Sequence, residues 1–139
     1  MKTESILKQK SYAFALQVVE TSKCLIYDKR EFILSKQFMR SGTAIGALIR
    51  EAEFAQSRAD FISKLSIALK ESNETDYWIS LLRDSLILNN DIASQLETNN
   101  KELIRILVSS IKTAKSSIKK NIIYMLIFIL IFSFLAFSF

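Results

Sequence analysis

The chain of 139 residues contains no proline and only two glycines, and this scarcity limits its fold more than any other feature. Tight turns between β-strands usually require glycine at a positive φ or proline at a fixed φ. A fold built from many short strands is therefore disfavoured. The length predicts one domain that buries a core of its own. We expect an all-α protein with few, short connections.

Both glycines, Gly42 and Gly46, lie in a stretch whose apolar residues have helical spacing. Glycine inside a helix costs about 1 kcal/mol relative to alanine, so its use here requires a compensating gain. The two residues lie about 40° apart around a helix. They form a face of small residues that lets a neighbouring helix backbone come close. We predict a helix-packing role for both.

Four segments show apolar residues at alternating spacings of three and four, which is typical of a helix with one buried face. They cover residues 7–25, 31–54, 57–86 and 92–118. The connections, around residues 26–30, 55–57 and 87–91, are short, which makes consecutive helices antiparallel. The sequence predicts an up-down-up-down four-helix bundle over residues 1–120, followed by a hydrophobic C-terminal helical extension over residues 121–139.

Helix-capping signals accompany two of these segments. Asp28 is placed to cap the second segment, with Glu31 reaching back toward it. Ser57 and Asp60 have the spacing of a capping box at the start of the third segment.

The buried face of the third segment contains small polar residues, Ser72 and Thr75, at its centre. A neighbouring helix can approach closely there, or the two side chains can form hydrogen bonds, so we assign them a helix-packing role. Tyr77 and Trp78 beside them are interpreted as packing residues. Cys24 is interpreted as a small residue of the core or its boundary.

The acidic residues of the second and third segments raise the hypothesis of a di-metal carboxylate site. They are Glu51, Glu53, Glu71, Glu74 and Asp76. The ferritin-like arrangement requires Glu-x-x-His pairs, and the chain contains no histidine. This absence also removes the commonest general base. We expect solvated acidic faces, no metal, no cofactor, no small-molecule substrate and no enzymatic activity.

The net charge of +5 arises entirely from residues 101–120, which contain six basic residues and one acid. On a helix, five of these cations fall within about 80° of the surface. They form what we call the basic stripe: Lys101, Arg105, Lys112, Lys115 and Lys119. Three interpretations are open: binding of nucleic-acid phosphates, contact with anionic lipid headgroups, or a solvated face favoured by cations near a helix C-terminus.

The last 18 residues, Ile122 to Phe139, contain no charge and would form a helix about 27 Å long. Such a helix would anchor the protein at the inner membrane. Lys119 and Lys120 precede it, and by the positive-inside rule they would keep the bundle on the cytoplasmic side. An accidental extension, built from residues common in translated AT-rich sequence, is the alternative.

The sequence resembles the bacterial four-helix-bundle proteins known as 23S rRNA intervening-sequence proteins. The resemblance extends from Ser11 to about Lys115. It rests on "SKQ" and "RSGT-IGA-I-EA" in the second segment, "QS-ADFI-KLSIALKE--ET-YW" in the third, and "IKTAK" in the fourth. The chain departs from the family at Leu48, where asparagine is usual, and in its hydrophobic tail.

The resemblance implies a homo-oligomer, typically a pentameric ring, with no attributed enzymatic activity. A related branch serves as accessory proteins of diversity-generating retroelements, in which a basic barrel is thought to contact nucleic acid. The first hypothesis is therefore a cytoplasmic, non-enzymatic oligomer that associates with RNA or DNA through the basic stripe. The second is a structural scaffold, tethered to the membrane through residues 122–139.

Overall fold

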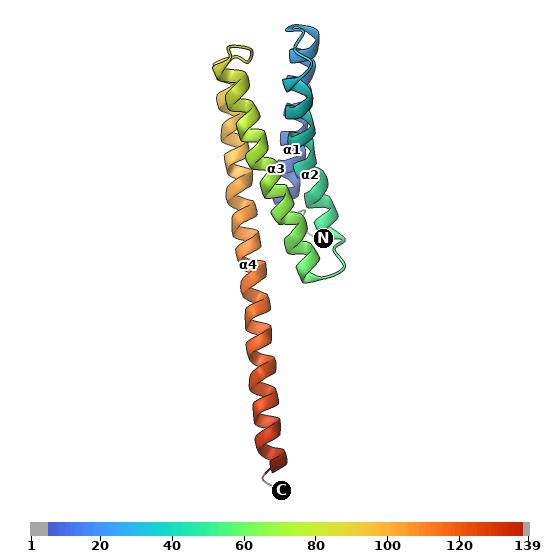
Figure 1. The fold of residues 1–139 in the computed structure, drawn as a ribbon, viewed down its shortest axis with the longest axis vertical. Coiled ribbons are helices and arrows are strands. Elements are labelled where there is room, and N and C mark those ends of the chain that lie inside the picture. Colours follow the sequence, from blue (N-terminus) through green and yellow to red (C-terminus); the bar gives the residue numbers. More distant parts are fainter. Residues whose placement is uncertain (1–5, 138–139) are drawn as a thin grey trace.

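The structure is a computed structural model that describes residues 6–137, with the side chains of residues 6–133. The described residues form four helices and no strand: α1 (Ile6–Tyr27), α2 (Leu34–Glu53), α3 (Arg58–Asp84) and α4 (Asn90–Phe137). Consecutive helices run antiparallel, and α4 projects far beyond the other three (Figure 1). The predicted all-α bundle with a helical C-terminal extension is confirmed.

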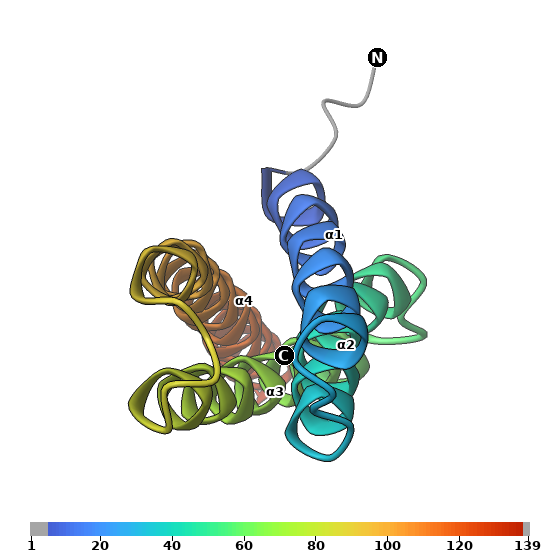
Figure 2. The same cartoon turned by 90° about the horizontal axis from the view of Figure 1, so that it is seen from above.

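The four helices enclose one interior when viewed from above (Figure 2). Each helix packs against the next one in the chain, and α4 closes the bundle with a smaller contact against α1. The α1–α2 and α2–α3 connections lie at opposite ends of the bundle (Figure 1). The α2–α3 connection therefore lies at the end from which α4 projects.

The core is formed by one face of each helix, and its residues follow the predicted spacing closely. Among the largest fully buried side chains are Phe14, Phe38, Ile45, Ile79 and Leu107. Burying an aliphatic or aromatic side chain of this size contributes about 1.5–3 kcal/mol. On α4 the predicted face shifts at its start, since Ile92 is 41% exposed and Ala93 is buried instead. Ile118, at the end of this face, is only half-buried.

The start of α2 differs from the prediction, because the helix begins at Leu34 and its N-cap residue, Ile33, makes no side-chain cap bond. Glu31, and not Asp28, binds the free N–H groups from outside the helix. The Glu31 carboxylate accepts hydrogen bonds from the backbone N–H groups of Ile33, Leu34 and Ser35 at 3.1, 2.9 and 2.6 Å. These are groups that the first turn leaves without helical partners. Desolvation raises the pKa of Glu31, but these backbone hydrogen bonds outweigh it and lower the pKa below its ordinary value.

The predicted cap of α3 by Ser57 is confirmed, while the reciprocal bond of Asp60 goes to the residue before the cap. Ser57 Oγ accepts a hydrogen bond from the Asp60 N–H at 3.1 Å. The Asp60 carboxylate reaches back and accepts the Gln56 N–H at 3.1 Å.

The end of α3 was placed too late by the prediction, because Leu86 lies beyond the helix and is 88% exposed. Leu86 has a φ of 61°, a left-handed conformation usually taken by glycine. The N–H of Ile87 bonds to the Leu82 carbonyl and that of Leu86 to the Arg83 carbonyl, which is the Schellman pattern. A chain with two glycines thus uses leucine at a glycine position.

The glycines lie where α2 meets α1, and their surroundings differ. A Cβ added at Gly42 would lie 2.7 and 2.8 Å from the two γ-methyl carbons of Val18, which is fully buried. A Cβ at Gly46 would lie 3.5 Å from the Ser11 carbonyl oxygen, an ordinary contact. The close approach of the helices therefore requires glycine at position 42 and only a small residue at position 46.

Replacing Glu31 with glutamine should lower the free energy of unfolding by about 1 kcal/mol at pH 7, because the cap loses its charge. Because the pKa of Glu31 is lowered in the folded protein, the wild type has the full stabilisation from the charged cap above about pH 4.5. It loses this stabilisation as the pH falls through the pKa of Glu31 in the folded state. Urea unfolding from pH 7 to pH 3 should show the two proteins converging in acid. Glu20→Gln on the exposed face of α1 is the control, and a constant difference at every pH would contradict the charge argument.

Replacing Gly42 with alanine should destabilise the bundle by about 1–3 kcal/mol, because the new methyl group meets β-branched Val18 in a packed interior. Gly46→Ala is the matched comparison and should be neutral or stabilising by up to about 1 kcal/mol. Thermal unfolding of both variants measures the difference. Combining Gly42→Ala with Val18→Ala should cost less than the sum of the single changes. Equal effects at positions 42 and 46 would refute this packing account.

Candidate nucleic-acid interface

The basic stripe lies on the outward face of α4, opposite the face that packs into the core. Leu103, Leu107 and Ile111 are buried on the core side. All five stripe residues are exposed: Lys101, Arg105, Lys112, Lys115 and Lys119. Eighteen residues separate the first from the last, which is about 27 Å along the helix. The structure therefore brings the predicted cations together as one continuous row.

The charge of the stripe is largely uncompensated. Lys101 Nζ lies 3.9 Å from Glu97, one turn earlier on the same helix. Among the residues whose side chains are described, none forms an ion pair with the other four members of the stripe. No acidic residue follows Glu102 in the sequence. The unpaired positive charge of the stripe thus lies from Arg105 to Lys119.

One interpretation of the stripe loses its physical basis in the structure. Cations are favoured at a helix C-terminus only within the last turn, where the partial negative charge of the dipole acts. Helix α4 continues to Phe137, so Lys119 lies 18 residues before its end. Compensation of the helix dipole therefore does not account for the stripe.

A helix that inserts sideways into a lipid interface buries its own apolar face in the acyl chains. On α4 that face is already occupied, because Leu103, Leu107 and Ile111 belong to the core of the bundle. The stripe can meet lipid only through its charges.

Four of the five acidic residues considered as metal ligands, all except Asp76, instead form ion pairs between helices. Glu51 binds Lys64 at 2.6 Å, and Glu53 binds Lys8 at 3.0 Å. Arg40 of α2 contacts both Glu71 and Glu74 of α3. The hydrogen bond from Arg40 to Glu74 raises the pKa of the guanidinium and lowers that of the carboxyl. Over the described residues there is no cluster of three or more potential metal-ligating side chains.

Ser72 and Thr75 belong to a polar layer that crosses the interior, and all its members are buried. The Thr75 hydroxyl donates to Ser41 Oγ of α2 at 2.9 Å. The Asn100 side-chain amide of α4 donates to the Ser72 carbonyl at 2.9 Å. The layer thereby joins α2, α3 and α4. Sequence reasoning missed Asn100, although its spacing from Leu96 and Leu103 identifies it as a core position.

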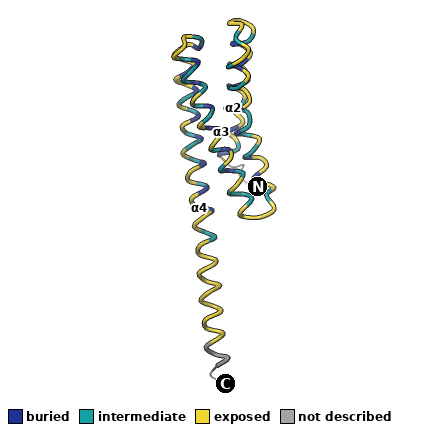
Figure 3. Tube along the Cα trace, in the orientation of Figure 1, coloured by how far each residue is buried: buried dark blue, intermediate teal, exposed yellow. Residues whose placement is uncertain are grey.

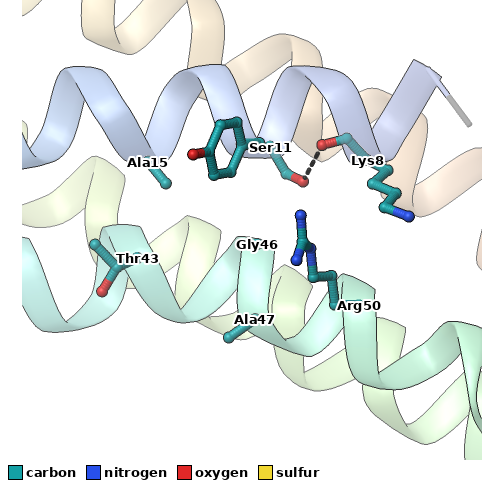
Figure 4. Close-up of a pocket in the computed structure, with 8 residues that line it drawn as sticks. Lys8, Ser11, Ala15, Thr43, Gly46, Ala47 and Arg50 are labelled. Carbon is teal, nitrogen blue, oxygen red and sulfur yellow. Dashed lines mark hydrogen bonds between the residues drawn. The ribbon is translucent and has the colours of Figure 1, made fainter. Parts of the chain in front are cut away.

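A groove lies between α1 and α2, beside Gly46 (Figure 4). Ala15, Gly46 and Ala47 line it, and the Arg50 guanidinium carbon lies 5.9 Å from the centre of the Tyr12 ring. Ser11 Oγ donates to the Lys8 carbonyl at 3.0 Å, so this hydroxyl is engaged within its own helix. These contacts indicate a packing surface and supply no reactive group.

Three other predicted residues have surroundings that sequence reasoning did not resolve. Cys24 is exposed, so its assignment to the core or its boundary is wrong. A hydrogen bond with Asp28 is the main reason that the pKa of the Cys24 thiol is raised. Tyr77 is 58% exposed, and Trp78 is half-buried with its indole N–H bonded to Glu74 at 3.1 Å.

A family model described as 23S rRNA-intervening sequence protein matches residues 3–109. A crystal structure of a protein of unknown function from the S23 ribosomal protein family of Bacteroides thetaiotaomicron is similar, with a TM-score of 0.76 and 48% identity. The match covers 77% of this chain and 99% of that chain. No curated protein matches.

Proposed function

Because the chain belongs to the 23S rRNA-intervening sequence protein family, as its motifs indicated, we propose that it is a non-enzymatic, homo-oligomeric bundle that associates with RNA through the basic stripe. The observation that carries this proposal is the row of exposed cations from Arg105 to Lys119, in a helix segment without a single acid. Such a row neutralises phosphates without reading bases, because backbone contacts dominate affinity.

The disposition of charge over the bundle supports a phosphate partner. Most acids of the bundle are engaged in ion pairs between helices or in helix caps, as at Glu53 and Glu31. The stripe cations lie on a regular helix, so binding does not have to order the backbone. The entropy cost of ordering on binding is therefore limited to the side chains. DNA would meet the same charges, and it is the second nucleic acid to test.

The alternative is a structural scaffold whose stripe is only solvated. The Lys101–Glu97 ion pair favours it, because one end of the stripe is partly neutralised. If the protein is such a scaffold, it should show no salt-dependent binding to RNA or DNA.

Binding of the full chain, in a neutral detergent, to a fluorescent single-stranded RNA should weaken about 100-fold between 50 and 200 mM salt, if five phosphates are neutralised. Changing Arg105, Lys112, Lys115 and Lys119 together to glutamine should reduce the slope of log affinity against log salt by about 3. Fluorescence anisotropy across a salt series measures both.

A matched control removes four exposed cations elsewhere: Lys23, Lys29, Lys36 and Lys70. Its net charge equals that of the stripe variant, so it should bind nearly as the wild type does. Equal losses in the two variants would show that net charge alone acts, and no binding by the wild type would refute the proposal.

The oligomer is proposed from the family resemblance and from apolar side chains on the outside of α1. Tyr12 is 57% exposed and Leu16 is 50% exposed, one turn apart. Burying such side chains between copies would gain hydrophobic free energy without changing the bundle.

Light scattering of a chain ending at Lys120 should give a mass close to five times that of the monomer. This shorter chain should fold, because the Bacteroides thetaiotaomicron protein is matched over 99% of its length by 77% of this chain. Changing Tyr12 and Leu16 to glutamate should lower the mass with the helical circular dichroism unchanged. A monomeric parent chain would contradict the proposal.

A further inference from the structure

The last part of α4 leaves the bundle and has no neighbour among the described residues. Arg58, at the start of α3, donates to Ser117 Oγ at 3.4 Å, close to the last level at which α4 touches another helix. From Lys119 to Ser133 every residue is exposed, and Figure 3 shows this part of the trace exposed throughout. No described part of the bundle therefore covers this segment.

The exposed segment is apolar on all sides. From Ile122 to Phe132, each side chain is large and hydrophobic, with between 45% and 70% of its surface exposed. Eleven consecutive residues at 100° per residue cover the whole circumference of the helix. A helix that docks on a soluble partner keeps a polar face toward water, whereas one that is apolar all round requires apolar surroundings on every side.

The dimensions and ends of the segment fit a lipid bilayer. The 18 uncharged residues from Ile122 are near the lower limit for crossing a hydrocarbon core of about 30 Å. Lys119 and Lys120 stand at its start, where their long side chains can extend to the headgroups. By length and composition, the described part of α4 qualifies as a membrane-spanning helix.

We propose that the end of α4 spans a bilayer and that the bundle stands on the cytoplasmic surface as a rigid continuation of the spanning helix. The helix is unbroken from Asn90 to Phe137, and the sequence has neither glycine nor proline after Gly46. No glycine or proline hinge therefore separates the bundle from the span. Lys119 and Lys120 contact anionic headgroups, in accordance with the positive-inside rule.

This arrangement determines which cations lipid can reach. Lys101 lies about 28 Å from Lys120 along the helix, and Arg105 about 22 Å. The screening length at physiological salt is about 8 Å, so the bilayer field acts on Lys115, Lys119 and Lys120 and not on the far end of the stripe. The upper stripe stays open to a soluble partner while the protein is anchored.

Insertion is tested with the full chain reconstituted into vesicles of phosphatidylcholine and phosphatidylglycerol at a ratio of about 3:1, which supplies the anionic headgroups that the two lysines require. After an alkaline wash, the wild type should float with the vesicles. The variant Ile127→Lys with Leu130→Lys should be lost from the floating fraction at least about tenfold. The control, Ile92→Lys with Val108→Lys, places the same charges at exposed apolar positions of the same helix within the bundle and should float as the wild type does.

Two outcomes would overturn insertion. One is a wild-type chain that the wash releases from the vesicles. The other is an Ile127→Lys, Leu130→Lys variant that floats as the wild type does, because two charges within a spanning helix should prevent its insertion. Circular dichroism of the bundle shows whether both variants are folded, since positions 127 and 130 touch no other helix in the described structure.

Orientation is tested by energy transfer from a dye on Cys24, the single cysteine, to labelled headgroups. Cys24 is exposed and shares a surface with Ile92 and Leu96, about 40 Å above Lys120 along α4. The comparison is Gln56→Cys in a Cys24→Ser chain, since Gln56 lies at the bundle end from which α4 projects (Figure 1). Transfer should be strong from position 56 and weak from position 24.

Equal transfer from the two positions would overturn the upright arrangement. Four glycines inserted after Lys120 should bring the two signals closer together, because they supply the hinge that the native helix lacks. An insertion without effect on either signal would show that the native junction is already flexible, and would also overturn the proposal.

Discussion

The unbroken course of α4 is the constraint on which the rest of the molecule depends. Its first half supplies a buried face to the core through Leu96, Leu103 and Leu107. Because the opposite face of the same helix must lie outward, the basic stripe is displayed as a direct consequence of core packing. Because no breaker follows, the apolar tail continues the same axis. Core, stripe and tail are three consequences of one helix.

The helical periodicity predicted the architecture because burial of one apolar face per helix dominates the folding free energy. The periodicity failed to predict the ends of helices, where other interactions determine which residues are buried or helical. At Ile92 the first turn of α4 takes a register that buries Ala93 instead, and periodicity alone does not locate the first buried position. At Leu86 the Schellman hydrogen bonds hold a leucine in a left-handed conformation, against its intrinsic preference.

The cap of α2 shows the same limit at a single residue. Asp28 and Glu31 are both acids ahead of the second helical segment, and the sequence alone does not say which one meets the free N–H groups. The choice depends on where the loop returns toward α1, where the Glu31 N–H bonds to the Leu25 carbonyl at 2.9 Å. That hydrogen bond within the α1–α2 loop positions Glu31 to cap the first turn. The basic stripe, in contrast, was predictable because only the helical period was required to align its members.

The polar layer and the close glycine contact together favour one arrangement of the helices. An apolar interior tolerates sliding of helices past one another, whereas buried hydrogen bonds must find defined partners. The bonds from Thr75 to Ser41 and from Asn100 to Ser72 hold α3 in register with α2 and α4. Gly42 against Val18 holds α2 close to α1. The direction in which α4 leaves the bundle is thereby fixed, and with it the direction of the stripe relative to any surface that the tail enters.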